Sequence, residues 1–121
     1  MTMVAEKLDY RELVQHVYNS FNLRNANAAL EVIHPKAEWA NAMEGGLLKG
    51  HQEINSYWHR QWSYIDWHVK FVDLTVEDSG NVVVNTNQII RDLSGNIVSI
   101  RDVQHVFRIE DGLIVEMRVR A

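Results

Sequence analysis

His105 is the residue whose chemistry and position best suit catalysis. In the segment 97–109 alternate residues share one face of a strand, and Phe107 and Val103 set the inward phase that His105 follows. The pKa of a free imidazole is about 6.5, which suits a general acid or base, or a donor to a developing oxyanion. The alternative is a buried, neutral histidine bonded to a neighbour.

Asn41 is the second candidate catalytic residue. It lies near the end of an expected strand, 37–43, on the same side as Trp39. Its amide has no titratable proton, so its role would be to orient a ligand through hydrogen bonds. The alternative is an asparagine that bonds the backbone where the strand ends.

Aromatic residues with inward phase could line a pocket for a flat or hydrophobic molecule, because such pockets are mostly apolar with few polar groups. Gln88 and Arg101 share that phase on their strands and would add donors. Arg101 would hold a carboxylate or an enolate oxygen at the pocket mouth, or else reach solvent or pair with a carboxylate at the rim. The alternative for the aromatic residues is that they fill the core. The predicted ligand-binding residues are Tyr18, Trp39, Tyr57, Trp58, Trp62, Gln88 and Arg101.

The spacing of the six histidines does not indicate a metal site. No two of them are four residues apart on a helix or two apart on a strand, and the chain has no Cys. The sequence also has no glycine-rich phosphate loop, no dinucleotide fingerprint and no Gly-x-Ser-x-Gly motif. We therefore expect neither a metal nor another cofactor.

Length and charge restrict the possible partners. A chain of 121 residues predicts one domain, 1–121. With 12 Lys and Arg against 16 Asp and Glu, the net charge is −4, so nucleic acid is not an expected partner. No apolar run is long enough to span a membrane, and the N-terminus lacks a signal-peptide pattern. We expect a cytoplasmic protein that does not bind membranes.

The hydrophobic pattern changes period after Asp66. Before it, the apolar residues recur at helical spacing, with Asn25 as the cap of the second helix and Pro35 as its end. After it, three turns that contain Gly separate four strands of an antiparallel meander. This order predicts an α+β fold in which three N-terminal helices pack on the concave face of a curved, mostly antiparallel sheet. The predicted helices span 8–21, 26–34 and 51–63.

The opposite face of the predicted sheet is too apolar to be fully solvated. A self-complementary contact there would remove β-branched side chains from water, so we expect a homodimer through this outer sheet face. Its predicted apolar residues are Val83, Ile89, Val98, Ile100, Val106 and Ile114.

Three strings in the chain carry a resemblance to a known family. They are YNSFNLRNANAALEVIHPKAEW, KGHQEINSYWHRQW and NQIIRDLSGNIVSIRDVQHVFRIEDGLI. With the order of the expected elements, they resemble the SnoaL-like branch of the nuclear-transport-factor-2-like superfamily, over nearly the whole chain. The resemblance implies a ketosteroid isomerase-like, cystatin-like cone whose wide end admits a small, mainly apolar ligand.

The same resemblance implies a site. In the ketosteroid isomerase members, a carboxylate on the first strand moves a proton, while a later acid and a first-helix tyrosine stabilise the oxyanion. These positions fall on Asn41, His105 and Val17, with Tyr18 one residue away from the tyrosine position. The chain departs from the pattern at Asn41, which cannot act as the base.

Two functions remain open from the sequence. The first is a cofactor-independent isomerase, cyclase or hydratase that acts on a small apolar carbonyl compound, with His105 as acid or base and Asn41 as positioning group. The second is a non-catalytic module for binding a small ligand or for dimerisation. The first predicts that His105 contacts Asn41 or a water molecule.

Overall fold

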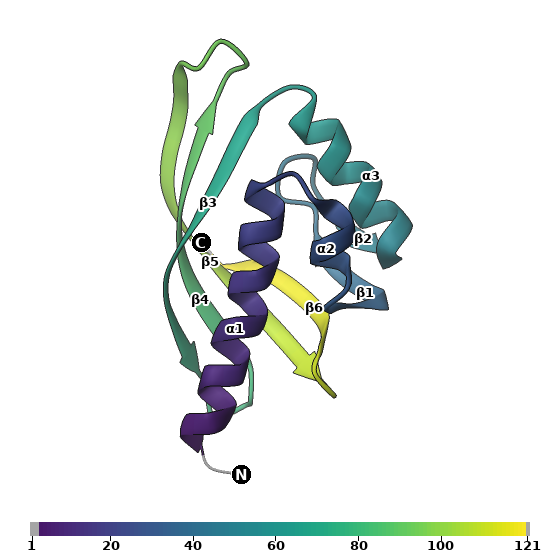
Figure 1. Cartoon of the computed structure of the whole chain (residues 1–121), viewed down its shortest axis with the longest axis vertical. Helices are drawn as coiled ribbons and strands as arrows, with labels where there is room; N and C mark the ends of the chain where they lie inside the picture. The colour runs from purple at the N-terminus through teal and green to yellow at the C-terminus, as the bar shows by residue number, and fades with distance from the viewer. Residues whose placement is uncertain (1–2, 121) are drawn as a thin grey trace.

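One six-stranded sheet and three helices make up the fold (Figure 1). The computed structural model describes residues 3–120. Strands β3 to β6 form an antiparallel meander, and β1 lies parallel to β6 and antiparallel to β2, which gives the order β2-β1-β6-β5-β4-β3. The elements are α1 (Met3–Asn22), α2 (Ala26–Leu30), β1 (Ile33–Ala40), β2 (Leu47–Lys49), α3 (Gly50–Trp62), β3 (Asp66–Val76), β4 (Val82–Arg91), β5 (Ile97–Glu110) and β6 (Leu113–Arg120).

Most of the predicted elements are confirmed. The α+β class, the three helices and the four-stranded meander with its three turns are all present. Asn25 caps α2 as expected, since its side chain accepts a hydrogen bond from the backbone N–H of Ala28 at 3.1 Å. No helix within residues 3–120 is long and apolar enough to cross a membrane.

The second helix is shorter than predicted, and the prediction that Pro35 ends it is wrong. The helix ends at Leu30, and the strand β1 already begins at Ile33. Ile33 pairs with Ile114 of β6, so pairing with a distant strand overrides the local helical pattern. The register shifts between Ile33 and Glu38, which leaves room in the ladder for Pro35, a residue without a backbone donor. The short strand β2, which pairs antiparallel to β1, was not predicted from the sequence.

The prediction that Ile114 lies on the outer face is wrong, because a bulge in β6 turns its side chain inward. Ile109 pairs with Ile114 while Arg108 pairs with Glu116, so the intervening residue has no partner. Such a bulge reverses the alternation of side chains. Ile114 therefore lies in the core, 0% exposed, and not on the outer face.

The inward face of the sheet packs against the helices mainly through aromatic rings. Phe21 of α1 contacts Trp67 of β3 at a centroid distance of 5.2 Å, and Trp58 of α3 contacts Trp39 of β1 at 5.8 Å. Edge-to-face pairs of this kind add to the burial energy of the rings. The predicted inward phase of β4 is confirmed by the burial of Val82, Val84, Thr86 and Gln88.

The side chain of Asn22 fastens the end of α1 to the sheet. β3 is an edge strand, and an edge strand has unpaired backbone groups. Asn22 donates from Nδ2 to the carbonyl oxygen of Val69 at 2.8 Å, and its Oδ1 accepts from the N–H of Val69 at 2.9 Å. The amide thus bonds the edge as a neighbouring strand would, and it fixes the distance between α1 and β3.

Replacing Asn22 by Ala should therefore destabilise the fold. Both backbone groups of Val69 lose their partner, and the free energy of unfolding should fall by about 1–3 kcal/mol. Urea denaturation measures the change. Asn19→Ala is the matched control, because Asn19 is an exposed asparagine on the same helix and should change stability by less than about 0.5 kcal/mol. Equal effects of the two variants would contradict the role of Asn22.

Candidate functional site

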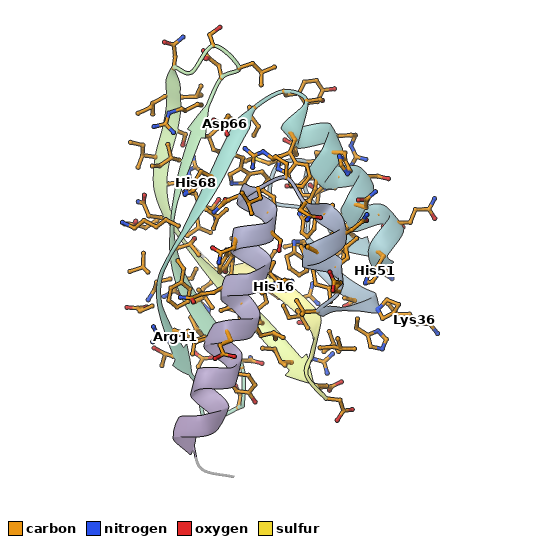
Figure 2. All side chains as sticks on the ribbon, in the orientation of Figure 1. Arg11, His16, Lys36, His51, Asp66 and His68 are labelled. Carbon is orange, nitrogen blue, oxygen red and sulfur yellow. The ribbon has the colours of Figure 1, made fainter. Side chains whose placement is uncertain are left out.

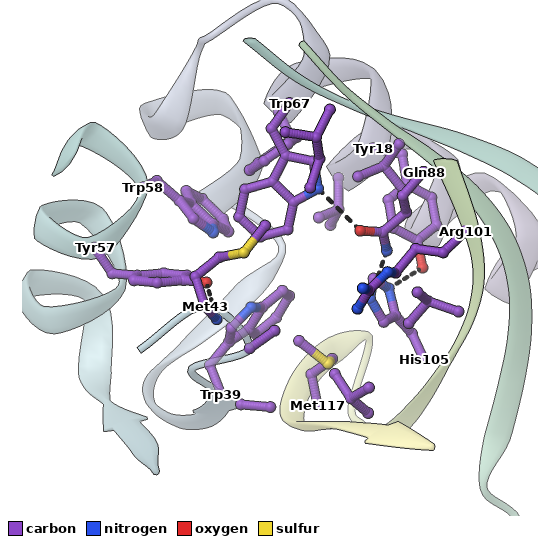
Figure 3. A pocket seen from close by; sticks show the side chains of 18 of the residues that line it. Tyr18, Trp39, Met43, Tyr57, Trp58, Trp67, Gln88, Arg101, His105 and Met117 are labelled. Carbon is purple, nitrogen blue, oxygen red and sulfur yellow. Dashed lines mark hydrogen bonds between the residues drawn. The ribbon is translucent and has the colours of Figure 1, made fainter. Parts of the chain in front are cut away.

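A cavity of about 300 Å³ lies between the inward face of the sheet and the helices α1 and α3 (Figure 3). Its wall is mainly apolar and aromatic, and the side chains of Tyr18, Gln88, Arg101 and His105, from α1, β4 and β5, gather on one side. Among residues 10–120, whose side chains the structure describes, Arg101 is the only charged residue of the wall, and no carboxylate lines it. The predicted residues Tyr18, Trp39, Tyr57, Trp58, Gln88, Arg101 and His105 all line the cavity.

The polar side of the cavity is built on a contact between Tyr18 and His105. The hydroxyl of Tyr18 lies 2.8 Å from Nδ1 of His105, and the two rings stack with centroids 5.7 Å apart. Tyr18 comes from the buried stripe of α1, and His105 from the inward phase of β5. The predicted phase of β5 is confirmed from Ser99 to His105, because Ser99, Arg101, Val103 and His105 line the cavity. It is wrong at Val98, which was predicted to lie on the outer face but lines the cavity, because the register shifts between Ile97 and Ser99. The hydroxyl partner for His105 could not be identified in the sequence.

Gln88 lies on the other side of the His105 ring. Its Nε2 is 3.3 Å from Nε2 of His105 and donates to Oγ1 of Thr86 at 3.2 Å. Its Oε1 accepts from the indole N–H of Trp67 at 2.9 Å. Thr86 in turn donates to the backbone carbonyl of Val103 at 2.7 Å. A continuous chain of hydrogen bonds thus joins β3, β4, β5 and α1.

Burial keeps this group of side chains uncharged at neutral pH. Removal from water lowers the pKa of His105 to about 4, since the charged imidazolium loses its hydration. The same cause raises the pKa of Tyr18 well above its ordinary value. The site therefore presents a neutral imidazole and a neutral phenol to the cavity.

Asn41 shapes a turn and does not line the cavity. Its Oδ1 accepts from the N–H of Glu44 at 2.9 Å, and its Nδ2 donates to Oε1 of Glu44 at 3.2 Å. Glu44 also accepts hydrogen bonds from Arg60 and Gln61 of α3. The bonds from Arg60 and Asn41 lower the pKa of Glu44 to about 2. Asn41 thus has the backbone-bonding role that was the alternative, and the expected contact between His105 and Asn41 is replaced by the contact with Tyr18.

Trp62 also lies outside the cavity wall, and Trp67 lines the cavity instead. Trp62 packs on Phe21 at 5.2 Å and on His59, on the far side of the aromatic cluster. Trp67 was missed, although strict alternation from Val69 along β3 gives it the inward phase. Met43 was missed as well, because it lies in a turn, where the hydrophobic pattern does not show which way a side chain points. Its backbone N–H donates to the hydroxyl of Tyr57 at 3.1 Å.

Arg101 lies on the wall with an exposed side chain. Among the described residues it has no ion pair or hydrogen bond through its guanidinium, whereas Arg24, Arg60, Arg108, Arg118 and Arg120 each pair with a carboxylate. The expected alternative of a rim carboxylate partner is therefore not present within residues 3–120.

The histidines outside the cavity do not gather. His16, His51 and His68 come from α1, α3 and β3 and lie apart in Figure 2. His16 and His51 contact the backbone carbonyl oxygens of Ala28 and Ile33. Within the described part of the chain, no group of three or more His, Asp or Glu residues is placed to hold a metal ion.

Comparison with known proteins identifies a family match. The model of the SnoaL-like domain matches residues 14–117, which include Tyr18, Gln88 and His105. No curated protein matches the chain.

Solved structures share the fold at low sequence identity. TerC, co-crystallised with polyporic acid, is 22% identical with a TM-score of 0.80, over 93% of this chain and 90% of that chain. A protein described as a polyketide cyclase from Sinorhizobium meliloti is 18% identical with a TM-score of 0.76, over 90% and 94%. An LEH-like epoxide hydrolase from M. tuberculosis is 16% identical with a TM-score of 0.77, over 94% and 83%. At these identities the likeness shows the fold.

The low pKa of His105 predicts a loss of stability in weak acid. The unfolded chain takes up a proton at His105 near pH 6.5, whereas the folded protein does so only near pH 4, so acidification favours unfolding between these values. The free energy of unfolding should fall by roughly 1 kcal/mol per pH unit from about pH 6 to about pH 4.5. Urea denaturation at several pH values measures this slope.

His105→Gln should reduce the slope by that amount, and the exposed His68→Gln serves as the matched control that retains it. An unchanged slope in His105→Gln would contradict the assignment to His105. The lowered pKa of the Glu44 carboxyl adds its own loss of stability at the acid end of this window, but Glu44 is present in both variants, so its contribution cancels in their comparison.

Proposed function

The chain belongs to the SnoaL-like domain family, and we propose that it uses its cavity to bind a small, mainly apolar molecule whose polar end meets Tyr18 and His105. The observation that carries this proposal is a buried hydrogen-bonding group at one side of an otherwise apolar cavity. Pockets for small organic molecules have this composition, with apolar walls for affinity and a few polar groups for orientation. The fold alone does not select a ligand, because one fold hosts many functions.

The walls favour a flat ring system. Trp39, Tyr57, Trp58 and Trp67 offer ring faces and edges, and the volume of about 300 Å³ suits a molecule of two or three fused rings. Arg101 at the mouth would hold a carboxylate or an enolate oxygen of the ligand, because its guanidinium has no partner among the described residues.

Catalysis is the second candidate, favoured by the contact between Tyr18 and His105. A phenol held by an imidazole in a cavity poor in water can polarise a carbonyl group and stabilise the oxyanion that forms. This chemistry is shared by cofactor-independent isomerases, cyclases and hydratases. The structural relatives described as a polyketide cyclase and an epoxide hydrolase are compatible with such a role. A binding module requires only that Tyr18 hydrogen-bonds the ligand, without any stabilisation of an oxyanion.

The binding proposal can be tested with two molecules of equal shape. 2-Acetylnaphthalene carries a carbonyl oxygen, and 2-isopropylnaphthalene has a methyl group in its place. The wild-type protein should bind the ketone about tenfold more tightly, the value of one hydrogen bond in a dry site, and Tyr18→Phe should abolish this preference. Isothermal titration calorimetry measures both affinities.

The matched control is Tyr64→Phe, which removes an exposed hydroxyl and should leave the preference in place. If neither naphthalene binds to the wild-type protein, and 2-naphthoic acid, which tests Arg101, also fails to bind, the proposal is wrong.

We further propose that two copies of the chain associate through the outer sheet face. Ile100 of β5 is 58% exposed on this face. Val83, Val106 and Ile114 of the predicted set are buried within one chain, and Val98 lines the cavity at a register shift of β5. The polar side chains beside Ile100 bond one another: Asn85 donates to Asp73, Asn87 donates to Asp102, and Gln104 donates to Asn85. A second copy offers the same polar and β-branched surface, as a twofold contact requires.

Light scattering at micromolar concentration should therefore give twice the chain mass of 14.1 kDa. Ile100→Glu should shift the mass to that of one chain, because it introduces a charge into the contact. Leu93→Glu, at an exposed turn position, is the control that should stay dimeric. A single-chain mass for the wild-type protein would refute the dimer.

A further inference from the structure

In the chain of hydrogen bonds on the polar side of the cavity, donors and acceptors can be assigned, because the groups at its two ends, the indole of Trp67 and the carbonyl of Val103, each have only one possible role. We infer that Gln88 holds His105 in the tautomer protonated at Nδ1, so that the hydroxyl proton of Tyr18 is left for the ligand, which must offer an oxygen acceptor. The inference that the ligand offers an oxygen acceptor rests on the proposed function, whereas the inference about the tautomer of His105 is independent of it. Figure 3 shows the side chains involved.

Both ends of the chain of hydrogen bonds fix the orientation of the Gln88 amide. The indole nitrogen of Trp67 is only a donor, so the atom of Gln88 that faces it at 2.9 Å must be the oxygen. At the other end, the carbonyl of Val103 is only an acceptor, so the hydroxyl of Thr86 gives it its one proton at 2.7 Å. The oxygen of Thr86 can then only accept, and the atom of Gln88 at 3.2 Å must be the nitrogen. The two ends agree.

The amide in turn fixes the tautomer of His105. Nε2 of Gln88 carries two protons, of which one goes to Thr86 and the other points to Nε2 of His105 at 3.3 Å. That ring nitrogen must therefore be the acceptor. A neutral imidazole with a lone pair on Nε2 carries its proton on Nδ1. Nδ1 lies 2.8 Å from the hydroxyl of Tyr18, so His105 donates and Tyr18 accepts.

The proton of the Tyr18 hydroxyl is then unused. No other hydrogen bond of this hydroxyl occurs among residues 10–120, whose side chains the structure describes, and the side chain lines the cavity while being buried from bulk water. A buried donor without an acceptor is costly, so the site selects ligands that supply one, such as a ketone, a quinone or an enolate. A hydrocarbon of the same shape leaves the donor unsatisfied.

The direction of the chain also distinguishes the roles of its members. Both nitrogens of His105 are engaged, Nε2 by Gln88 and Nδ1 by Tyr18, so in this state the imidazole has no free lone pair toward the cavity. Tyr18 is the group that touches the ligand. His105 and Gln88 are positioning residues, and the bond from Nδ1–H strengthens Tyr18 as a donor because it stabilises negative charge on the phenol oxygen.

The tautomer can be measured directly on the wild-type protein without a ligand. Two-dimensional NMR of the full chain, labelled with ¹⁵N-histidine, gives distinct signals for protonated and unprotonated ring nitrogens. Near pH 7 the spectrum should assign a protonated Nδ1 and an unprotonated Nε2 to His105, whose signals are identified by their loss in His105→Gln. A protonated Nε2, with or without a proton on Nδ1, would overturn the inference.

Gln88→Met tests the positioning role. It removes the donor to Nε2 while keeping a long side chain, so the form protonated at Nε2 should become populated, and Tyr18 should then give its proton to Nδ1. Thr86→Val is the matched control in the same chain of bonds: Trp67 still orients the amide, so the tautomer should stay as in the wild-type protein. If Gln88→Met keeps His105 fully protonated at Nδ1, Gln88 does not set the tautomer.

The inference that the Tyr18 proton selects the ligand is tested by a separate measurement of binding affinity. In Gln88→Met the preference for 2-acetylnaphthalene over 2-isopropylnaphthalene should fall severalfold, while Thr86→Val retains it. An unchanged preference in a variant whose tautomer has shifted would show that the Tyr18 proton is not what selects the ligand. If neither compound binds to the wild-type protein, the inference about the ligand fails with the proposed function, and the NMR result still decides the tautomer.

Discussion

The structure depends on one constraint: polar side chains enclosed by apolar rings must find most of their hydrogen-bond partners among one another, because they are largely removed from bulk water. Tyr18, His105, Gln88 and Thr86 are all buried, and each has a partner within the group or on the backbone. The cost of an unpaired polar atom at such a place exceeds the net gain of most single contacts. The relative positions of α1, β4 and β5 are therefore fixed by hydrogen bonding as well as by packing.

The aromatic cluster supplies the rigid frame for this group. Phe21 touches Trp58, Trp62 and Trp67 with centroid distances between 5.2 and 5.7 Å, and so links α1 to α3 and β3. Such rings have few rotatable bonds, so little conformational entropy remains to be lost when a ligand binds. Asn22 and the packing of Phe21 hold the C-terminal end of α1 at the edge strand, one turn from Tyr18. A cavity lined in this way keeps its shape when empty.

Local periodicity was sufficient to predict the fold class, the meander and most of the wall. The alternation of β4 and β5 correctly oriented Gln88, Arg101 and His105, because a period of two leaves only one choice once the core side is known. It failed at Ile114, where a bulge interrupts the alternation, and at β1, where pairing with β6 overrides a helical pattern.

The contact at the centre of the site was beyond this reasoning. Tyr18 and His105 are 87 residues apart, and no pattern within either segment specifies that they meet. Trp62 has the same helical face as Trp58 by sequence, yet the angle of α3 turns Trp62 toward Phe21 and away from the cavity. Such results depend on the angles between elements, which periodicity does not determine.

The charge balance of the cavity limits the chemistry that it can support. An enzyme that removes a proton from carbon needs a base with a free lone pair near the substrate. Asn41 cannot act as one, Glu44 is held by Arg60, Asn41 and Gln61 outside the wall, and the ring nitrogens of His105 are both engaged. What the wall does offer is a neutral donor at the inner end and a cation at the mouth. Both groups favour electron density on ligand oxygen atoms, so the site is suited to bind and polarise a carbonyl or an enolate. Because the described residues of the wall offer no base, any proton removed from carbon must be taken up by water or by the ligand itself.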